Sequence, residues 1–147
     1  SIMQSLKDRN DFWAIRDSVG EILAQIKDEA NFDIGIPINK TESCLNQIEK
    51  ALKSKFPDLV YMVFGHLGDG NLHIIAATGN KDDKMEIYDT VYQITGENNG
   101  GVAAEHGIGV LKKPWLHLSR TEQEINLMRQ LKVALDPKNI LNPGRVI

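Results

Sequence analysis

The chain has 147 residues, 41% of them hydrophobic and 25% charged, and its formal net charge at pH 7 is −3. This length and composition are those of one ordinary globular domain with a hydrophobic core. The slightly negative charge, without any basic run, speaks against a nucleic-acid partner or an anionic membrane surface, and no apolar run approaches the roughly 20 residues of a membrane-spanning helix.

Cys44 is the only cysteine, which excludes an internal disulfide and fits a reducing compartment. No secretion signal is visible at the polar start of the sequence. We therefore expect the protein in the cytoplasm, or in the mitochondrial matrix if its source is eukaryotic.

In chain order, apolar residues first recur at helical spacing over residues 2–27, which predicts a long N-terminal helix. Its abrupt beginning suggests the C-terminal piece of a longer protein. Gly20 weakens this helix and calls for a packing or ligand reason. Residues 32–36 alternate apolar side chains and end at a proline, which predicts a short strand at a sheet edge. Residues 41–56 again carry a helical pattern.

The second half of the chain continues with two apolar segments, residues 59–66 and 71–78, which are predicted strands joined by a glycine-rich loop. Residues 81–97 are a predicted helix, which two asparagines and two glycines stop. Residues 102–106 are expected to form a final short strand.

The order of the elements over residues 32–106 is therefore β-α-β-β-α-β, as in the ferredoxin-like split βαβ unit. We expect an α+β domain, in which two helices cover one face of an antiparallel sheet and further helices flank it at both ends. The C-terminal helix should begin at Thr121, where Glu124 completes a capping box.

The stretch "GHLGDGNLH", residues 65–73, has a histidine near its start and another at its end. If Asp69 and Gly70 form a two-residue hairpin turn, His66 and His73 face each other with Cβ atoms about 4.5–5.5 Å apart. Two imidazoles in that arrangement could share one metal ion. The alternative is a pair of histidines that only form hydrogen bonds at the end of a hairpin.

A third candidate ligand lies in "AAEHGIG", residues 103–109. In the expected sheet the closing strand would lie beside the strand that ends in His66, so that Glu105 would converge on His66 and His73. Two imidazoles and a carboxylate suit zinc with an open position, or Fe(II)- and manganese-type chemistry, although Glu105 could equally be a solvated surface carboxylate. His106 would remain free to act as a general base, because an ordinary histidine titrates near working pH.

Three motifs, "FGHLGDGNLH", "AAEHGIG" and the terminal "LDPKNILNPGRV", occur together and in this order, and "FWAIRDSVG" resembles a Trp-x-x-Arg helix. Together they resemble the C-terminal domain of the FAD-linked oxidases, the family of D-lactate dehydrogenase, the glycolate oxidase flavin subunit and D-2-hydroxyglutarate dehydrogenase. The resemblance runs from about Phe12 to the end. It implies that residues 1–147 are one domain of a larger flavoprotein, whose N-terminal FAD-binding domain this chain lacks.

The resemblance implies an FAD-dependent dehydrogenase or oxidase that acts on the CH–OH group of 2-hydroxy acids. His66, His73 and Glu105 stand where the family binds a divalent metal, here expected to be zinc or manganese, and His106 stands where it has the catalytic base. Arg16 matches an arginine that binds the substrate carboxylate, although it could be a surface arginine. The expected partners are the small 2-hydroxy acid, the FAD-binding domain and, in a homo-oligomer, a second copy. Alone, the chain should be inactive.

The chain also departs from the hydroxyglutarate-oxidising members, which have a threonine, a lysine and an asparagine where it has Gly20, Asn31 and Ile75. Contacts to a distal carboxylate would then be absent, so a D-lactate- or glycolate-like substrate is expected. Two other classes of function stay open. One is a metal-dependent hydrolase, although no zinc-protease helix motif is present, and the other is a ferredoxin-like module that binds a small molecule.

Overall fold

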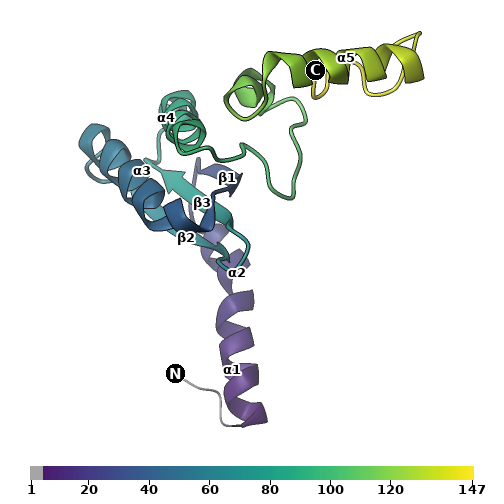
Figure 1. Cartoon of the computed structure of the whole chain (residues 1–147). Coiled ribbons are helices and arrows are strands. Elements are labelled where there is room, and N and C mark those ends of the chain that lie inside the picture. Colours follow the sequence, from purple (N-terminus) through teal and green to yellow (C-terminus); the bar gives the residue numbers. More distant parts are fainter. Residues whose placement is uncertain (1–4) are drawn as a thin grey trace.

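Three short segments with alternating apolar residues form an antiparallel sheet in the computed structural model, which describes residues 5–147 (Figure 1). Strand β3 (Asn71–Ala77) lies in the centre, between β1 (Ala30–Gly35) and β2 (Val60–His66). The α+β class is thus confirmed, and β1 is an edge strand as expected.

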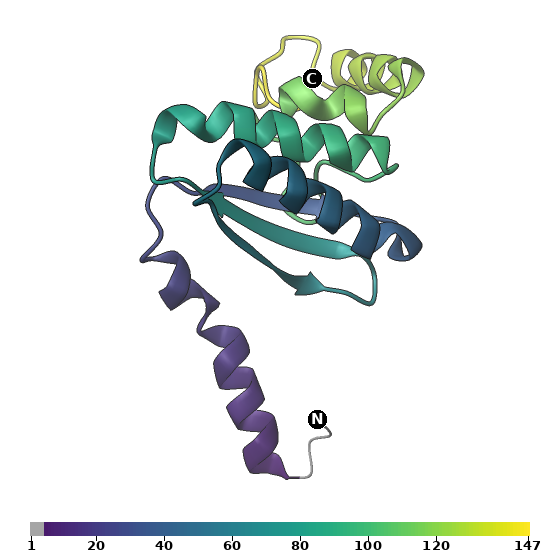
Figure 2. The same ribbon diagram turned by 90° about the vertical axis from the view of Figure 1, so that its left-hand side faces the viewer.

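Helices α3 (Thr41–Lys55) and α4 (Lys84–Glu97) lie side by side on one face of this sheet (Figure 2). Both were expected from the helical spacing of their apolar residues, which they direct onto the sheet. The core between the two layers contains strand, helix and loop residues: Ala30, Phe32, Ile34, Ile36, Cys44, Ile48, Leu52, Leu59, Leu72, Ile74, Ala76, Ile87, Tyr88, Val91, Tyr92, Val102 and Trp115. This packing leaves the opposite face of the sheet for the polar residues of the candidate site.

The remaining helices flank this unit. Short 3₁₀ turns η1 (Ile38–Lys40) and η2 (Lys81–Asp83) precede α3 and α4, and η3 (Lys113–Leu118) follows the loop after α4. Helix α5 (Glu122–Leu135) begins with the predicted capping box, in which Thr121 and Glu124 bond each other's backbone N–H groups. In the described part of the chain, each helix is too short or too polar to cross a membrane.

The predicted N-terminal helix is two helices in the structure, α1 (Leu6–Asp17) and α2 (Val19–Leu23). The break falls at Ser18, whose hydroxyl donates to the Ile15 carbonyl at 2.7 Å. Residues 2–4 of the prediction lie outside the described residues. All side chains of α1 are at least partly exposed, and the helix projects from the sheet (Figure 1). Gly20, the residue expected to weaken the helix, lies within α2.

The register of the hairpin differs from the prediction by two residues. His66 pairs with Asn71, and His73 pairs with Phe64 on β2 and with Asp33 on β1. The loop therefore has four residues, 67–70, instead of a two-residue Asp-Gly turn. Its geometry comes from the Asp69 carboxylate, which accepts the Asn71 backbone N–H at 3.0 Å and so forms a local turn of its own.

Gly70 in this loop is needed both for its backbone conformation and for a long-range contact. Its φ is +75°, and a Cβ atom there would collide with the Ile36 carbonyl oxygen. The Gly70 carbonyl in turn accepts the Ile36 N–H at 2.8 Å, so the loop is tied to the end of β1.

The expected closing strand, residues 102–106, is also different. Only a single antiparallel bridge forms, between Gly101 and Gly35, and it lies at β1 instead of beside the strand that ends in His66. Beyond the bridge the backbone N–H groups of residues 104–106 donate to the side chain of Asp33, so they are not available for strand pairing. The closing segment is thus a loop that folds over the polar face of the sheet.

Candidate active site

Glu105 lies over the end of the polar sheet face, against the last residue of β2 and the first residue of β3. Its Oε1 atom is 3.6 Å from Nε2 of His66, and it accepts a hydrogen bond from the side-chain amide of Asn71. His66 and Asn71 are direct partners in the ladder, so the sheet itself brings the two groups that contact the carboxylate together.

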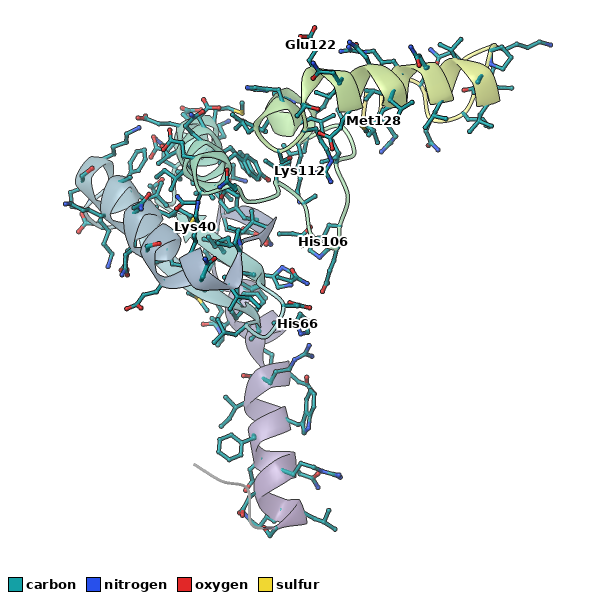
Figure 3. All side chains as sticks on the ribbon, in the orientation of Figure 1. Lys40, His66, His106, Lys112, Glu122 and Met128 are labelled. Carbon is teal, nitrogen blue, oxygen red and sulfur yellow. The ribbon has the colours of Figure 1, made fainter. Side chains whose placement is uncertain are left out.

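His73 lies two residues farther along β3, on the same face. Its ring is between the ring of Phe64, with centroids 5.2 Å apart, and the ring of His106, at 5.3 Å and nearly parallel to it. Figure 3 shows His106 and His66 on the same side of the molecule, where the loop meets the sheet. The four residues expected at the site therefore lie at one end of the same sheet face as a cluster of two contacting pairs, His66 with Glu105 and His73 with His106, and the two sheet histidines do not face each other directly.

Asp33, on β1, holds the loop that carries Glu105 and His106. It is only 1% exposed. Its two carboxylate oxygens accept the backbone N–H groups of residues 104, 105 and 106 at 2.8–3.2 Å, and the ammonium group of Lys112 at 3.1 Å. Four donors thus converge on this carboxylate, three of them on Oδ2 alone.

These contacts also determine the protonation of Asp33. Burial by itself raises the pKa of a carboxyl group, but the N–H groups of Glu105 and His106 and the charge of Lys112 outweigh this effect and lower the pKa of Asp33 to about 2. Asp33 is therefore an anion at every pH at which the protein would work.

Two sets of residues in this region could be considered as metal ligands. The ligand atoms of Asp33, His73 and His106 lie within 4.8 Å of one another. Asp33, however, already accepts three backbone N–H groups and is paired with a buried cation, which weakens it as a metal ligand. The structure favours Asp33 as an anchor of the loop.

The set predicted from the sequence, His66, His73 and Glu105, has the donor chemistry for a divalent cation. His66 and Glu105 are 3.6 Å apart, but the three ligand atoms do not all lie within 4.8 Å of one another, so His73 would have to move toward them to bind the same ion. A further observation points to a missing polar partner: Oδ1 of Asn71 is buried, and it accepts a hydrogen bond from none of the described residues. Asn71 donates to Glu105 with the nitrogen of the same amide, so a cation or a donor group that satisfied this oxygen would lie near the candidate site.

A cleft of about 700 Å³ connects this cluster to the N-terminal helices. Arg16 of α1 and Gly20 of α2 line it together with His66 and His73. The Arg16 guanidinium is exposed, 3.0 Å from the Asp17 carboxylate and 5.6 Å from the ring centre of Trp13. The structure thus brings Arg16 to the same cleft as the two histidines.

The family of this chain follows from a match that covers almost all of it. The family model for the FAD linked oxidases, C-terminal domain, matches residues 1–146. The chain belongs to this family. The resemblance seen in the three motifs is therefore confirmed.

The curated relatives of this FAD-linked oxidase domain are longer proteins. It is 34% identical to a probable mitochondrial D-2-hydroxyglutarate dehydrogenase of Oryza sativa subsp. indica, over 99% of this chain and 26% of the relative. It is 36% identical to the mitochondrial D-2-hydroxyglutarate dehydrogenase of Bos taurus, over 92% of this chain and 25% of the relative. It is 31% identical to the D-2-hydroxyglutarate dehydrogenase of Stutzerimonas stutzeri, over 97% of this chain and 32% of the relative. The chain thus spans about a quarter to a third of their length.

Sequence reasoning missed three residues of the FAD-linked oxidase domain that shape the site: Asp33, Asn71 and Lys112. Asp33 alternates with Phe32 and Ile34 in a strand and so has the pattern of a solvent-facing position. Its burial depends on a loop some seventy residues later in the chain. The sequence holds only an indirect sign of this role, since Asp33 and Lys112 carry opposite charges and could form an ion pair.

Proposed function

We propose that the chain is the C-terminal substrate domain of an FAD-dependent 2-hydroxy acid dehydrogenase, with an FAD-binding domain on its N-terminal side. The observation that carries this proposal is the cluster of His66, His73, Glu105 and His106 at a cleft that Arg16 also lines. Membership of the family supports it over the hydrolase and the binding module. We place the protein in the mitochondrion of a eukaryotic source, as the names of its plant and animal relatives state, with the matrix as our proposed compartment there, and in the cytoplasm of a bacterial source.

In this proposal Arg16 binds the carboxylate of the 2-hydroxy acid, for which its planar guanidinium is suited. His66, His73 and Glu105 would hold the divalent metal, which polarises the substrate hydroxyl when it is bound, while FAD is the acceptor of the hydride. Asn71 keeps Glu105 oriented through its side-chain amide.

His106 accepts the proton of the substrate hydroxyl. Its Nδ1 atom lies 3.9 Å from Oδ2 of Asp33, beyond hydrogen-bond distance, and in this proposal the other ring nitrogen, Nε2, takes the proton. The Cα hydrogen leaves with its electron pair as hydride, and the product is the 2-oxo acid. Each molecule of substrate thus gives one proton to His106 and one hydride to the flavin.

For the substrate we propose a D-2-hydroxy acid without a second carboxylate, such as D-lactate or glycolate. Gly20 contributes no polar group to the cleft, and Ile75 is buried and apolar. Asn31, its partner in the ladder, carries no positive charge. The names of the relatives favour a second candidate, D-2-hydroxyglutarate.

The choice of substrate can be tested by anaerobic stopped-flow reduction of the flavin in the chain joined to its FAD-binding domain. We expect D-lactate to exceed D-2-hydroxyglutarate in kcat/KM by at least about tenfold, which corresponds to about 1.4 kcal/mol of transition-state binding. L-lactate serves as the stereochemical control. A preference for D-2-hydroxyglutarate would show that other residues bind the distal carboxylate.

The metal site can be tested by titration of zinc and manganese into the purified chain, followed by calorimetry. His73→Ala is expected to lower the affinity at least about tenfold, because one of three protein ligands is lost. The matched control is His117→Ala, since His117 lies on η3 with its Nδ1 atom 2.9 Å from the Pro114 carbonyl, outside the cluster. Equal affinities in wild type and His73→Ala would refute the proposed ligand set.

A further inference from the structure

The loop of residues 104–112 begins and ends at the same carboxylate. At its start, the N–H groups of residues 104–106 donate to the side chain of Asp33. At its end, the ammonium group of Lys112 donates both to that side chain, at 3.1 Å, and to the backbone carbonyl of Asp33, at 3.2 Å. Both side chains are buried, so the Asp33–Lys112 ion pair closes the loop into a ring.

Few other backbone contacts hold the loop in place. Gly107 and Gly109 have positive φ angles, +74° and +57°, and their Cβ positions would meet no atom within 4 Å. Ile108 packs against the core, and the Gly109 carbonyl accepts the N–H of Val146 at 2.8 Å. The exposed side chains of Glu105 and His106 do contact the sheet, through Asn71 and the His73 ring, but these contacts can form only where the backbone of the loop places the two residues.

We propose that Asp33 and Lys112 are positioning residues, whose ion pair sets where Glu105 and His106 stand relative to the two sheet histidines. The inference rests on the proposed function, because it assigns Glu105 to the metal and His106 to the proton. The pair touches neither the substrate nor the metal. It acts through the backbone of the loop, as partners behind metal ligands and catalytic groups commonly do.

The chain contains a second aspartate that accepts backbone N–H groups and pairs with a lysine, remote from the site. Asp136, at the end of α5, accepts the N–H groups of Ile140 and Leu141 at 3.0 and 2.9 Å and pairs with Lys132. α5 lies at the far end of the molecule from β2, whose last residue is His66 (Figure 1). Lys132→Met therefore removes a comparable ion pair without touching the site.

The test compares Lys112→Met with Lys132→Met in the chain joined to its FAD-binding domain. Three quantities are measured: the midpoint of thermal unfolding, the visible absorption of bound Co²⁺, and steady-state kinetics with D-lactate. Both variants should unfold at lower temperature. Only Lys112→Met should alter the Co²⁺ spectrum and lower kcat by about 10–100-fold, because Glu105 and His106 lose the support of their loop. The change in KM should be smaller, because Arg16 can still bind the substrate carboxylate. Lys112→Arg, which keeps the charge, should restore part of kcat.

The outcomes separate this inference from the proposed function. If Lys112→Met matches Lys132→Met in the Co²⁺ spectrum and in kcat, the pair only stabilises the fold and the inference is wrong. If wild type binds no Co²⁺ but reduces flavin, the metal assignment fails and the kinetic comparison still decides the inference. If wild type binds Co²⁺ but no substrate tested reduces the flavin, the comparison of the Co²⁺ spectra decides whether the inference is correct. If wild type does neither, the proposed function fails and the inference with it.

Discussion

Asp33→Asn is expected to lower the free energy of unfolding by about 3–5 kcal/mol, the usual cost of removing one partner of a buried ion pair. The amide would leave Lys112 buried without a counter-charge. It would also present an NH₂ group to backbone N–H donors that the two carboxylate oxygens now accept. Urea unfolding of the chain, followed by circular dichroism, measures the loss. Amide hydrogen exchange should show faster exchange at residues 104–106.

The control for this variant is Asp136→Asn, which disrupts the hydrogen bonds from residues 140 and 141 to Asp136 at the end of α5. It should destabilise the chain as well, but leave amide exchange at residues 104–106 unchanged. A loss of less than about 1 kcal/mol in Asp33→Asn, within the range of an ordinary hydrogen bond, would mean that the buried pair contributes little.

The pKa of Asp33 makes part of this stability depend on pH. Its folded value of about 2 lies below the ordinary value of 3.8, so the contribution is fully present above the ordinary pKa and is lost as the pH falls through the folded one. The gap between the two values corresponds to about 2 kcal/mol. The stability difference between wild type and Asp33→Asn should therefore shrink by this amount between about pH 5 and pH 2.

The order and type of the central elements could be predicted because local patterns decide them. The apolar spacing of α3 and α4 and the capping box at Thr121 act within a few residues of sequence, and the structure has all three where they were expected. Register is not local in this sense. The four-residue loop depends on the contact of Gly70 with Ile36, thirty-four positions earlier, and no local reading of Asp69 and Gly70 reveals it.

The members of the site cluster could be named from sequence, but not the reason that they meet. The prediction relied on a paired strand to bring Glu105 to His66. In the structure a buried carboxylate does so, because Asp33 takes the N–H groups that would otherwise enter a ladder. The same side chain explains why a strand pattern at residues 102–106 ends as a loop with a single bridge.

His106→Asn should reduce the rate of flavin reduction by roughly 10²–10⁴-fold, the usual contribution of a positioned general base. The variant is informative because the contacts between Asp33 and the loop should survive it: Asp33 accepts the backbone N–H of residue 106, at 2.8 Å, and not its side chain. Glu105, and with it the proposed metal site, should therefore keep its place. Asparagine is also polar and smaller than histidine, so it introduces no clash in the exposed loop.

The measurement is anaerobic stopped-flow reduction of the flavin by D-lactate, in the chain joined to its FAD-binding domain, with metal and flavin content determined in parallel. His73→Ala should lose metal and activity together, whereas His106→Asn should lose only activity. His117→Asn, on η3, should reduce flavin like wild type. A wild-type rate in His106→Asn would assign the proton to another group and leave His106 as a ring that stacks on His73 and supports it.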